Sequence, residues 1–507
     1  LQYELSYTNM LNMLDLAGVP IYSKDRTELA PIICVGGPCT CNPEPIADFC
    51  DIIFIGEGEE STNHVIDLLK ECKLNGESKQ QFLEKAKNIT GVYVPSLYVD
   101  SYNDDGTLKE LKPIGDAPLP IKKSIISDMN AVHYPKEFVV PFINVVHDRA
   151  VAEIFRGCIR GCRFCQAGFI YRPIREKSVE TINKQCKELI KNTGYDEISL
   201  CSLSTSDHSQ VNELLTTLID WTVKEKINLS LPSLRVDNFS DELVDKLNKV
   251  RKSGLTFAPE AGTQRLRDVI NKNVTEEDLF RAVGLAYSVG KTQVKLYFMN
   301  GLPTETDEDI EGIAKLARDV LSVYYNTRER NRMRAPQVTV SVSCFIPKPF
   351  TPFQWEAQND FEELERKQKL LRDHITSRKI DYKYHDAKVS RLEAVFAKGD
   401  RRLGKALAYA VENGQRFDAW DEFFSYENWM GYFADTGIDP AFYANRRWDV
   451  DEVLPWDVID CGVTKAFLKR ERVKAYEAAT TPNCREGCSG CGANKLGGER
   501  TCCPKKK

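Results

Sequence analysis

One segment decides the fold prediction: Arg156-Gly157-Cys158-Ile159-Arg160-Gly161-Cys162-Arg163-Phe164-Cys165. Its cysteines follow a C-x₃-C-x₂-C spacing, directly after the apolar run of residues 152–155 and before a segment with helical spacing. Three thiolates on one short loop can ligate three irons of a cubane [4Fe–4S] cluster. The fourth iron then has no protein ligand, and its open position can take the amine and carboxylate of an amino acid. The segment therefore predicts a cluster with Cys158, Cys162 and Cys165 as its protein ligands.

A zinc knuckle is the alternative interpretation of the same three cysteines. Zinc in structural sites takes four ligands, and no fourth cysteine or histidine lies near the triplet in the sequence. Cys186 and Cys201 fall in apolar helix and strand patterns, which favours buried positions for both. The place of the triplet between a strand and a helix, at the start of a repeating pattern, favours the cluster.

A strand–loop–helix rhythm continues from residue 150 to residue 375. Helical spacing fills most gaps between short apolar runs; for example, Val179, Ile182 and Cys186 share one face after an expected N-cap at Ser178. The rhythm predicts an α/β fold with a partial (β/α) barrel, in which ligands bind at the carboxyl ends of the strands. The six expected strands are residues 152–155, 197–201, 228–231, 255–258, 293–298 and 337–345.

Other regions flank this core on both sides. The N-terminal region alternates short apolar runs with helical spacing, as an incomplete Rossmann-like domain would. A turn signal at Asp104-Asp105-Gly106 indicates a hairpin in the region that follows. The expected boundaries are 1–74 for the N-terminal domain, 75–145 for hairpin and linker, 146–375 for the core, 376–480 for a mostly helical C-terminal domain, and 481–507 for a Cys-rich tail.

The tail repeats the cysteine spacing of the triplet. Cys484, Cys488 and Cys491 form a second C-x₃-C-x₂-C, and Cys502 and Cys503 follow. Five thiols suffice for an auxiliary iron–sulfur cluster or for a four-thiolate zinc site. A segment with so few core-forming residues needs a metal to be ordered, and a disordered, reactive tail is the alternative. The sequence does not decide between iron and zinc.

Composition limits the function classes. Of 507 residues, 42% are hydrophobic, and 69 basic against 74 acidic residues give a net charge of −5. A general nucleic-acid binder usually has a basic excess, so charge does not indicate RNA binding. No apolar run is long enough to span a membrane, and no signal peptide is visible. The 17 cysteines without an export signal indicate a reducing compartment, so we expect a cytoplasmic protein with no membrane partner.

With these motifs in place, the core resembles the radical S-adenosylmethionine (SAM) superfamily over residues 150–375. The resemblance implies a 5′-deoxyadenosyl radical that abstracts hydrogen from an unreactive carbon, and an electron donor such as flavodoxin or ferredoxin. It also implies that residues near the carboxyl ends of the strands contact SAM. The implied contacts are Phe164, Ser202, Ser204, Asp207, Ser233, Arg235 and Glu260. The Gly-Gly-Glu that is usual in the second-strand motif of the family is absent from residues 202–207.

Some of these residues have a plainer alternative role. Arg235, expected to hold the SAM carboxylate, has a surface ion pair as its alternative. Residues 254–263 resemble a fifth-strand motif near the nucleoside, and for Glu260 the alternative is a capping carboxylate of the following helix. Residues 295–306 resemble the sixth-strand segment, where we expect the Gly-Leu-Pro turn to be architectural.

Two N-terminal glycine turns resemble the second half of a cobalamin-binding domain. They are Gly36-Gly37-Pro38 and Gly56-Glu57-Gly58-Glu59, each at the end of an apolar run. The corrin-ligating motif of such domains, Asp-x-His-x-x-Gly, is absent from this chain, which opens with Leu1 rather than Met. Either the motif lies upstream of Leu1, or cobalt is bound without a protein histidine, or the domain has lost the cofactor.

Over nearly its whole length the chain resembles bacterial radical SAM proteins that have an N-terminal B12-binding-like region and a cysteine-rich C-terminus. The barrel is also similar to RNA and protein methylthiotransferases. Three functions follow. The first is radical modification of an unidentified substrate, with cobalamin-linked methyl transfer as one such reaction. The second is methylthio transfer to RNA or protein, for which the tail would supply an auxiliary cluster. The third is a non-catalytic iron–sulfur or zinc scaffold or redox sensor.

Overall fold

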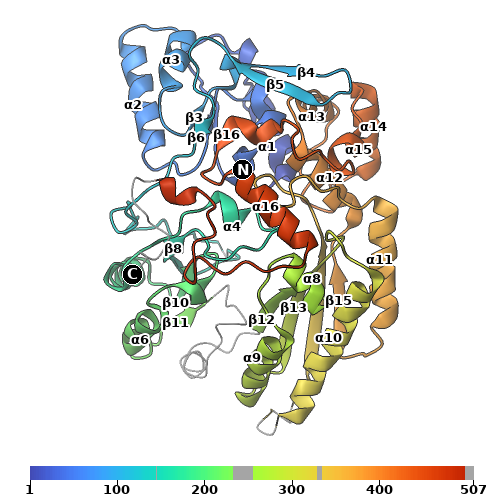
Figure 1. The fold of residues 1–507 in the computed structure, drawn as a ribbon. Helices are drawn as coiled ribbons and strands as arrows, with labels where there is room; N and C mark the ends of the chain where they lie inside the picture. Colours follow the sequence, from blue (N-terminus) through green and yellow to red (C-terminus); the bar gives the residue numbers. More distant parts are fainter. Residues whose placement is uncertain (144, 232–254, 328–329, 331–333, 497–507) are drawn as a thin grey trace.

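The computed structural model describes residues 1–143, 145–231, 255–327, 330 and 334–496. Elements from both ends of the chain lie together at the top of Figure 1, and the parallel strands of the core lie below them. This arrangement confirms the predicted α/β class. Four residues with predicted roles, Ser233, Arg235, Cys502 and Cys503, lie outside the described residues.

The core contains two sheets whose strands all run parallel. β7 (Ala150–Glu153), β10 (Glu197–Cys201) and β11 (Asn228–Ser230) form one sheet in the order β11-β10-β7. The other sheet follows chain order and contains β12 (Leu255–Glu260), β13 (Gln293–Asn300), β14 (Gln337–Cys344) and β15 (Ile380–Tyr384). Because the strands are parallel, their carboxyl ends lie on one edge of each sheet. All six predicted strands are present.

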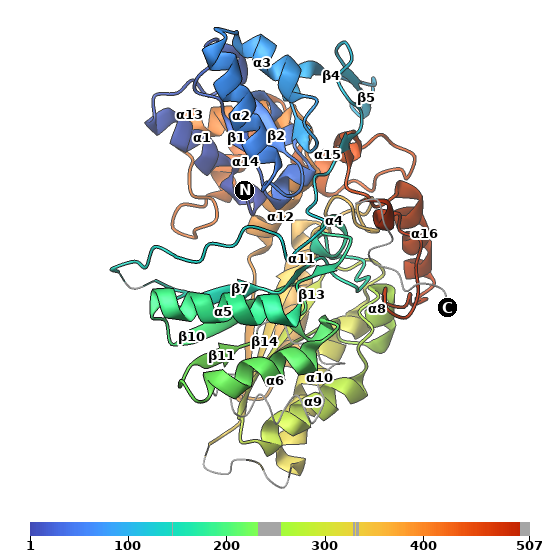
Figure 2. The same cartoon turned by 90° about the vertical axis from the view of Figure 1, so that its left-hand side faces the viewer.

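Helices pack against these sheets, as Figure 2 shows for α5, α6 and α10. The predicted face of α5 is confirmed, because Ile182, Cys186 and Leu189 are fully buried and Ser178 Oγ accepts a hydrogen bond from the Thr181 amide. The core helices are α4 (Ala167–Ile170), α5 (Val179–Thr193), α6 (Val211–Thr222), α8 (Gln264–Val269), α9 (Glu276–Ser288), α10 (Asp307–Asn326) and α11 (Phe361–His374). No helix in the described ranges is both long and apolar enough to cross a membrane.

β15 is a strand that the sequence did not indicate. It pairs with β14 and lies beyond residue 375, where the core was expected to end. Only Ile380 of its five residues is buried, because β15 is the edge strand of its sheet. An edge strand carries polar side chains and lacks the apolar run of a central parallel strand. The run Ile380-Asp381-Tyr382-Lys383-Tyr384 therefore gave no strand signal.

The N-terminal region forms a small sheet of its own. β1 (Cys34–Val35) and β2 (Ile52–Phe54) pair in parallel, and β3 (Val92–Tyr93) runs antiparallel to β2. The predicted hairpin is formed by β4 (Tyr98–Tyr102) and β5 (Leu108–Pro113). The helices of this region are α1 (Tyr7–Leu16), α2 (Ser61–Leu74) and α3 (Lys79–Ala86).

The two ends of the chain share one hydrophobic core. Leu11 and Phe49 from the N-terminal region are fully buried in the same cluster as Leu407 and Trp429 from the C-terminal helices. β16 (Ile459–Asp460) also pairs in parallel with β6 (Ile121–Lys122). The C-terminal helices are α12 (Ala387–Lys398), α13 (Leu403–Glu412), α14 (Tyr426–Thr436), α15 (Pro440–Ala444) and α16 (Lys465–Tyr476). Segments that the sequence divided into two regions therefore pack together around a shared core.

The N-terminal glycine turns are filled by the protein's own backbone. Gly37 has a φ of +110°, and a Cβ there would overlap the Leu1 carbonyl oxygen. Gly56 has a φ of +96°, and a Cβ there would overlap the Ser124 carbonyl oxygen. The Ser124 amide donates to the Ile55 carbonyl oxygen at 2.9 Å. Both turns need glycine so that another part of the chain can approach closely.

Candidate active site

The cysteine triplet lies on a loop that two short strands close at its base. β8 (Phe155–Arg156) and β9 (Arg175–Glu176) pair antiparallel on either side of it. Gly157, between β8 and the first cysteine, has a φ of +89°, and a Cβ there would lie 2.8 Å from the Pro173 carbonyl oxygen. The loop therefore leaves β8 through a turn that only glycine fits without strain.

The three thiols lie close enough to influence one another. Cys158, Cys162 and Cys165 are all partly buried. Burial, followed by the neighbouring Cys162 thiol, raises the pKa of Cys158 to about 11 and that of Cys165 to about 12. These thiols stay protonated at neutral pH until a metal binds, because coordination removes the proton.

The donor set fits an iron–sulfur cluster in its chemistry. Among the described residues, no three His, Cys, Asp or Glu side chains stand ready around a common metal position. Cys158, Cys162 and Cys165 must therefore turn toward one point to act as ligands. Three thiols on one loop are nevertheless the ligand type that iron–sulfur clusters take from proteins.

Arg160, between the first two cysteines, is held by Asp207. Arg160 Nε lies 2.9 Å from Asp207 Oδ2 and its Nη2 lies 2.5 Å from Oδ1, in a buried ion pair. Ser204 Oγ donates to Asp207 Oδ2 at 2.7 Å, and Ser202 Oγ lies 3.1 Å from Thr205 Oγ1. Two of the predicted SAM contacts, Ser204 and Asp207, thus fasten the triplet loop to the segment after β10.

Arg163, between the second and third cysteines, is completely buried. Its Nη2 lies 3.1 Å from Glu471 Oε2 of α16 and donates to the Ala479 carbonyl oxygen at 2.7 Å. Its Nη1 donates to the carbonyl oxygens of Asp268 and Val269. The loop is therefore tied to the end of α8 and to the C-terminal helix. The roles of Arg160 and Arg163 were not predicted from the sequence, because no nearby residue indicates that their partners lie far away in the chain.

Phe164 and Glu260 also lie near the triplet. Phe164 packs against a buried cluster that includes Ala261. Glu260 ends β12 with a φ of +69°, which is unusual for a residue with a side chain, and its Oε1 accepts a hydrogen bond from Lys272 Nζ at 3.2 Å. Lys272 is close enough to Cys165 to oppose the rise in pKa that burial causes in that thiol. Such backbone conformations persist at sites where the surrounding structure imposes them.

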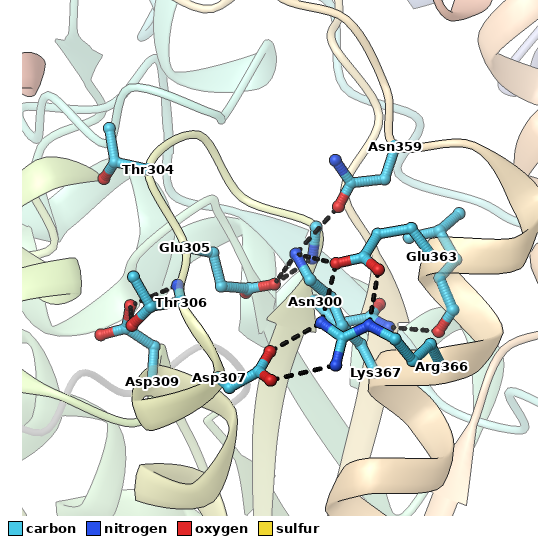
Figure 3. A network of polar contacts seen from close by, with 12 residues as sticks. Asn300, Thr304, Glu305, Thr306, Asp307, Asp309, Asn359, Glu363, Arg366 and Lys367 are labelled. Carbon is cyan, nitrogen blue, oxygen red and sulfur yellow. Dashed lines mark hydrogen bonds and ion pairs between the residues drawn. The ribbon is translucent and has the colours of Figure 1, made fainter.

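A polar network holds the turn that follows β13 (Figure 3). Glu305 Oε2 accepts a hydrogen bond from the Gly301 amide at 2.7 Å and lies 2.8 Å from Lys367 Nζ of α11. Arg366, also of α11, binds Asp307 through two hydrogen bonds of 3.0 and 2.6 Å. The Gly-Leu-Pro turn is fixed by these buried and bridging charges, which agrees with the architectural role expected for it.

The second cysteine set lies against the triplet loop. The Cys484 amide donates to the Ile159 carbonyl oxygen at 3.0 Å. Arg485 Nη2 donates to the Asp207 carbonyl oxygen at 2.8 Å, and the Arg485 guanidinium lies 2.5 Å from Glu176 Oε1. The fold thus brings the two C-x₃-C-x₂-C segments together, although most of the chain separates them in sequence.

Two parts of the chain match known protein families. Two family descriptions match the chain: "Radical SAM proteins, N-terminal" over residues 1–95 and "Radical SAM superfamily" over residues 152–317. The uncharacterised protein MJ0966 of Methanocaldococcus jannaschii is 31% identical over 442 residues, which cover 86% of this chain and 85% of that protein.

Two more similarities extend this comparison. The putative methylthiotransferase MJ0865 of the same organism is 25% identical over 288 residues, covering 49% of this chain and 61% of that protein. The solved structure of the radical SAM methyltransferase TsrM from Kitasatospora setae, with cobalamin and a [4Fe–4S] cluster bound, has a TM-score of 0.41 and 13% identity. It covers 61% of this chain and 56% of that one.

The parallel strand–helix repeats and the cysteine loop at their start define an α/β enzyme of the iron–sulfur class. The chain belongs to the radical SAM superfamily. It is therefore a radical SAM enzyme, whose cofactors are a [4Fe–4S] cluster and SAM, and it acts on a substrate with the help of a reductant.

Proposed function

We propose that Cys158, Cys162 and Cys165 hold the [4Fe–4S] cluster, and that the enzyme modifies an unidentified substrate in the cytoplasm. The loop geometry carries the proposal: β8 and β9 close its base, and Arg160 and Arg163 fix the stretches between the cysteines. When bound, the cluster supplies the electron that cleaves SAM to a 5′-deoxyadenosyl radical. Flavodoxin or ferredoxin is the kind of donor that would reduce it.

The protein's own residues position the reactants. Arg160 and Arg163 restrict the loop through buried ion pairs, so the backbone that carries the three thiols stays in place while the side chains turn toward the cluster. Phe164 and Glu260 lie beside the triplet and suit contacts with the adenine and the polar part of SAM. Ser204 and Asp207 act through Arg160. The remaining predicted SAM contacts are Ser202, Ser233 and Arg235.

Methylthio transfer to RNA or protein is the reaction that one specific observation favours. It needs an auxiliary cluster near the first, and the tail cysteines lie against the triplet loop. Cobalamin-linked methyl transfer is the other reaction predicted from the sequence. Its expected cobalamin turns, at Gly37 and Gly56, are occupied by the protein's own backbone. Product mass separates a methyl from a methylthio group, and the cobalt content of the intact protein tests cobalamin directly.

Anaerobic reconstitution tests the cluster assignment. The protein is loaded with iron and sulfide, reduced with dithionite and mixed with SAM, and 5′-deoxyadenosine is quantified. We expect 5′-deoxyadenosine from the unaltered chain and none from the Cys158→Ala/Cys162→Ala/Cys165→Ala variant. Cys34→Ala, which removes an exposed thiol of β1, is the matched control and should keep the activity.

A second measurement does not depend on turnover, since cleavage of SAM can require the substrate. SAM that binds the open iron changes the electron paramagnetic resonance (EPR) signal of the reduced cluster. We expect that change in the unaltered chain and in Cys34→Ala. A chain that carries no iron at the triplet loop, or an unchanged EPR signal with SAM, contradicts the proposal.

A further inference from the structure

Arg172 is a buried cation that lies between the two cysteine sets. It follows α4 and is 3% exposed. Its Nη2 donates to the Arg160 carbonyl oxygen at 2.7 Å, within the triplet loop, and its Nε donates to the Gly168 carbonyl oxygen at 2.9 Å. The guanidinium carbon also lies 4.8 Å from the ring centre of Phe169 and 5.9 Å from that of Phe467. The position of its charge is therefore fixed on several sides.

No carboxylate in the described part of the chain pairs with Arg172. Its Nη1 is buried and has no hydrogen-bond partner there. The other buried arginines around the loop are all compensated: Arg160 by Asp207, Arg163 by Glu471 and Arg175 by Glu57. An isolated buried charge costs several kcal/mol, so a fold that keeps one has a counter-ion to place beside it.

The groups beside Arg172 are thiols of the tail and of the triplet. Its guanidinium lies against Cys491, without the geometry of a full hydrogen bond, and within electrostatic range of Cys484 and Cys158. A protonated thiol carries no charge and cannot balance the guanidinium. A thiolate bound to a metal does carry negative charge, and binding releases the thiol proton to solvent.

Backbone contacts and glycine turns of the tail fix the position of Cys491. The carbonyl oxygen of Cys491 accepts a hydrogen bond from the Thr464 amide at 2.9 Å, and the Cys491 side chain is buried. Gly490 and Gly492 have φ values of +71° and +102°, so the backbone on either side of Cys491 turns in ways that favour glycine. Together with the Cys484–Ile159 hydrogen bond, these contacts anchor both ends of the second cysteine segment.

We propose that Cys484, Cys488 and Cys491 hold a second metal–thiolate centre beside the triplet loop, with Arg172 as the buried cation that balances its charge. Thiolates are ligands both of iron–sulfur clusters and of zinc, and a zinc ion would take one ligand beyond these three. The proposal deepens the proposed function, because a second centre here would lie next to the SAM-binding cluster. It does not depend on that cluster being present.

Metal content of two complementary variants tests the centre. The full chain without the triplet thiols (Cys158→Ala/Cys162→Ala/Cys165→Ala) should still bind iron with sulfide, or about one zinc ion per chain. Adding Cys484→Ala/Cys488→Ala/Cys491→Ala should remove that metal. The tail variant alone should keep the iron of the triplet. Metal that stays in the chain without either set of thiols, or no metal in the triplet variant, overturns the second centre while leaving the first assignment untouched.

The role of Arg172 is tested in the triplet variant. Arg172→Met should shorten the half-time of metal loss to a chelator by about tenfold, as changes beside metal ligands do. Arg172→Lys keeps the positive charge, so its half-time of metal loss should lie closer to that of the triplet variant with Arg172 intact. Arg470→Met, which removes an exposed cation 3.4 Å from the Gly490 carbonyl oxygen, is the matched control and should change little.

Thermal unfolding keeps this test decisive if the methionine variant is less stable. Metal should raise the Tm of the parent more than that of Arg172→Met, because only the parent gains a counter-ion for a buried charge. Equal metal-dependent shifts, together with equal half-times of metal loss, overturn the assignment of Arg172.

Discussion

The two C-x₃-C-x₂-C segments have the same spacing and different surroundings. Between the triplet cysteines, Arg160 and Arg163 are buried and pair with carboxylates from other elements. Between the tail cysteines, Arg485 and Glu486 are exposed, and the segment is anchored mainly at its ends. The spacing alone says that a metal can be held. The buried ion pairs decide which segment is held rigidly enough for chemistry that depends on geometry.

Removing the triplet thiols should have the largest effect. We expect Cys158→Ala/Cys162→Ala/Cys165→Ala to abolish 5′-deoxyadenosine formation. The corresponding tail variant, Cys484→Ala/Cys488→Ala/Cys491→Ala, should keep it within about tenfold, because it alters groups beside the cluster rather than its ligands. Quantifying 5′-deoxyadenosine under anaerobic conditions compares the two. Equal losses would mean that the two segments are not distinguished by their anchoring.

Breaking the Arg163–Glu471 pair should have the next largest effect. Arg163→Met leaves the buried Glu471 with Lys474 as its remaining cationic partner and removes the donor to three carbonyl oxygens, which we expect to lower the free energy of unfolding by about 3–5 kcal/mol. Adding Glu471→Leu should recover part of that loss, since it removes the buried carboxylate that Arg163 balanced. Denaturant unfolding of both variants measures the coupling. Arg485→Met, at an exposed position of the tail, should lower the free energy of unfolding by less than about 1 kcal/mol. A loss as large as that of Arg163→Met would contradict the difference in anchoring between the two segments.

Acid should weaken the ion pairs that Glu57 makes at the base of the triplet loop. Burial tends to raise the pKa of Glu57, but Arg175 and Arg156 outweigh it and lower the pKa below its ordinary value of 4.5. The contribution of the Glu57 carboxylate to the free energy of unfolding is therefore complete above the pKa of Glu57 in the unfolded chain. It is lost as the pH falls through the lower pKa of Glu57 in the folded protein. We expect the free energy of unfolding of the unaltered chain, measured by denaturant unfolding, to decrease as the pH drops below about 5. Glu57→Gln should weaken that dependence on pH. Glu486→Gln, which replaces an exposed carboxylate of the tail, is the matched control.

The glycine before the second cysteine gives the smallest and most closely matched comparison. At Gly161 a Cβ would lie 2.9 Å from Asn271 Nδ2, which donates to the Gly161 carbonyl oxygen. At Gly487 nothing lies within 4 Å of a Cβ. We expect Gly161→Ala to cost about 1–3 kcal/mol through overpacking, and Gly487→Ala to stay within about 0.5 kcal/mol. Thermal unfolding compares them, and similar values would show that the two segments are equally confined.

The sequence predicted those parts of the fold that local pattern controls. The six predicted core strands are short runs whose apolar residues are mostly buried, and α5 carries a buried stripe at helical spacing, so both could be predicted from a short window of sequence. β15 could not, because an edge strand carries the polar residues that also suit a loop. The domain boundaries stay predictions, and the core shared by the two chain ends shows how contacts between distant segments escape a linear reading.

By itself, the sequence determined the α/β class, the parallel repeats and the three thiols on one loop, because strand periodicity and ligand spacing are local properties. Only the tertiary structure decided which residues hold that loop, including the ion pair between Asp207 and Arg160. It also decided that the tail lies beside the triplet, with Arg172 between the two cysteine sets. The physical reason is that buried charges are compensated by partners in space. The sequence positions of Arg163 and Glu471 give no sign that the two side chains meet.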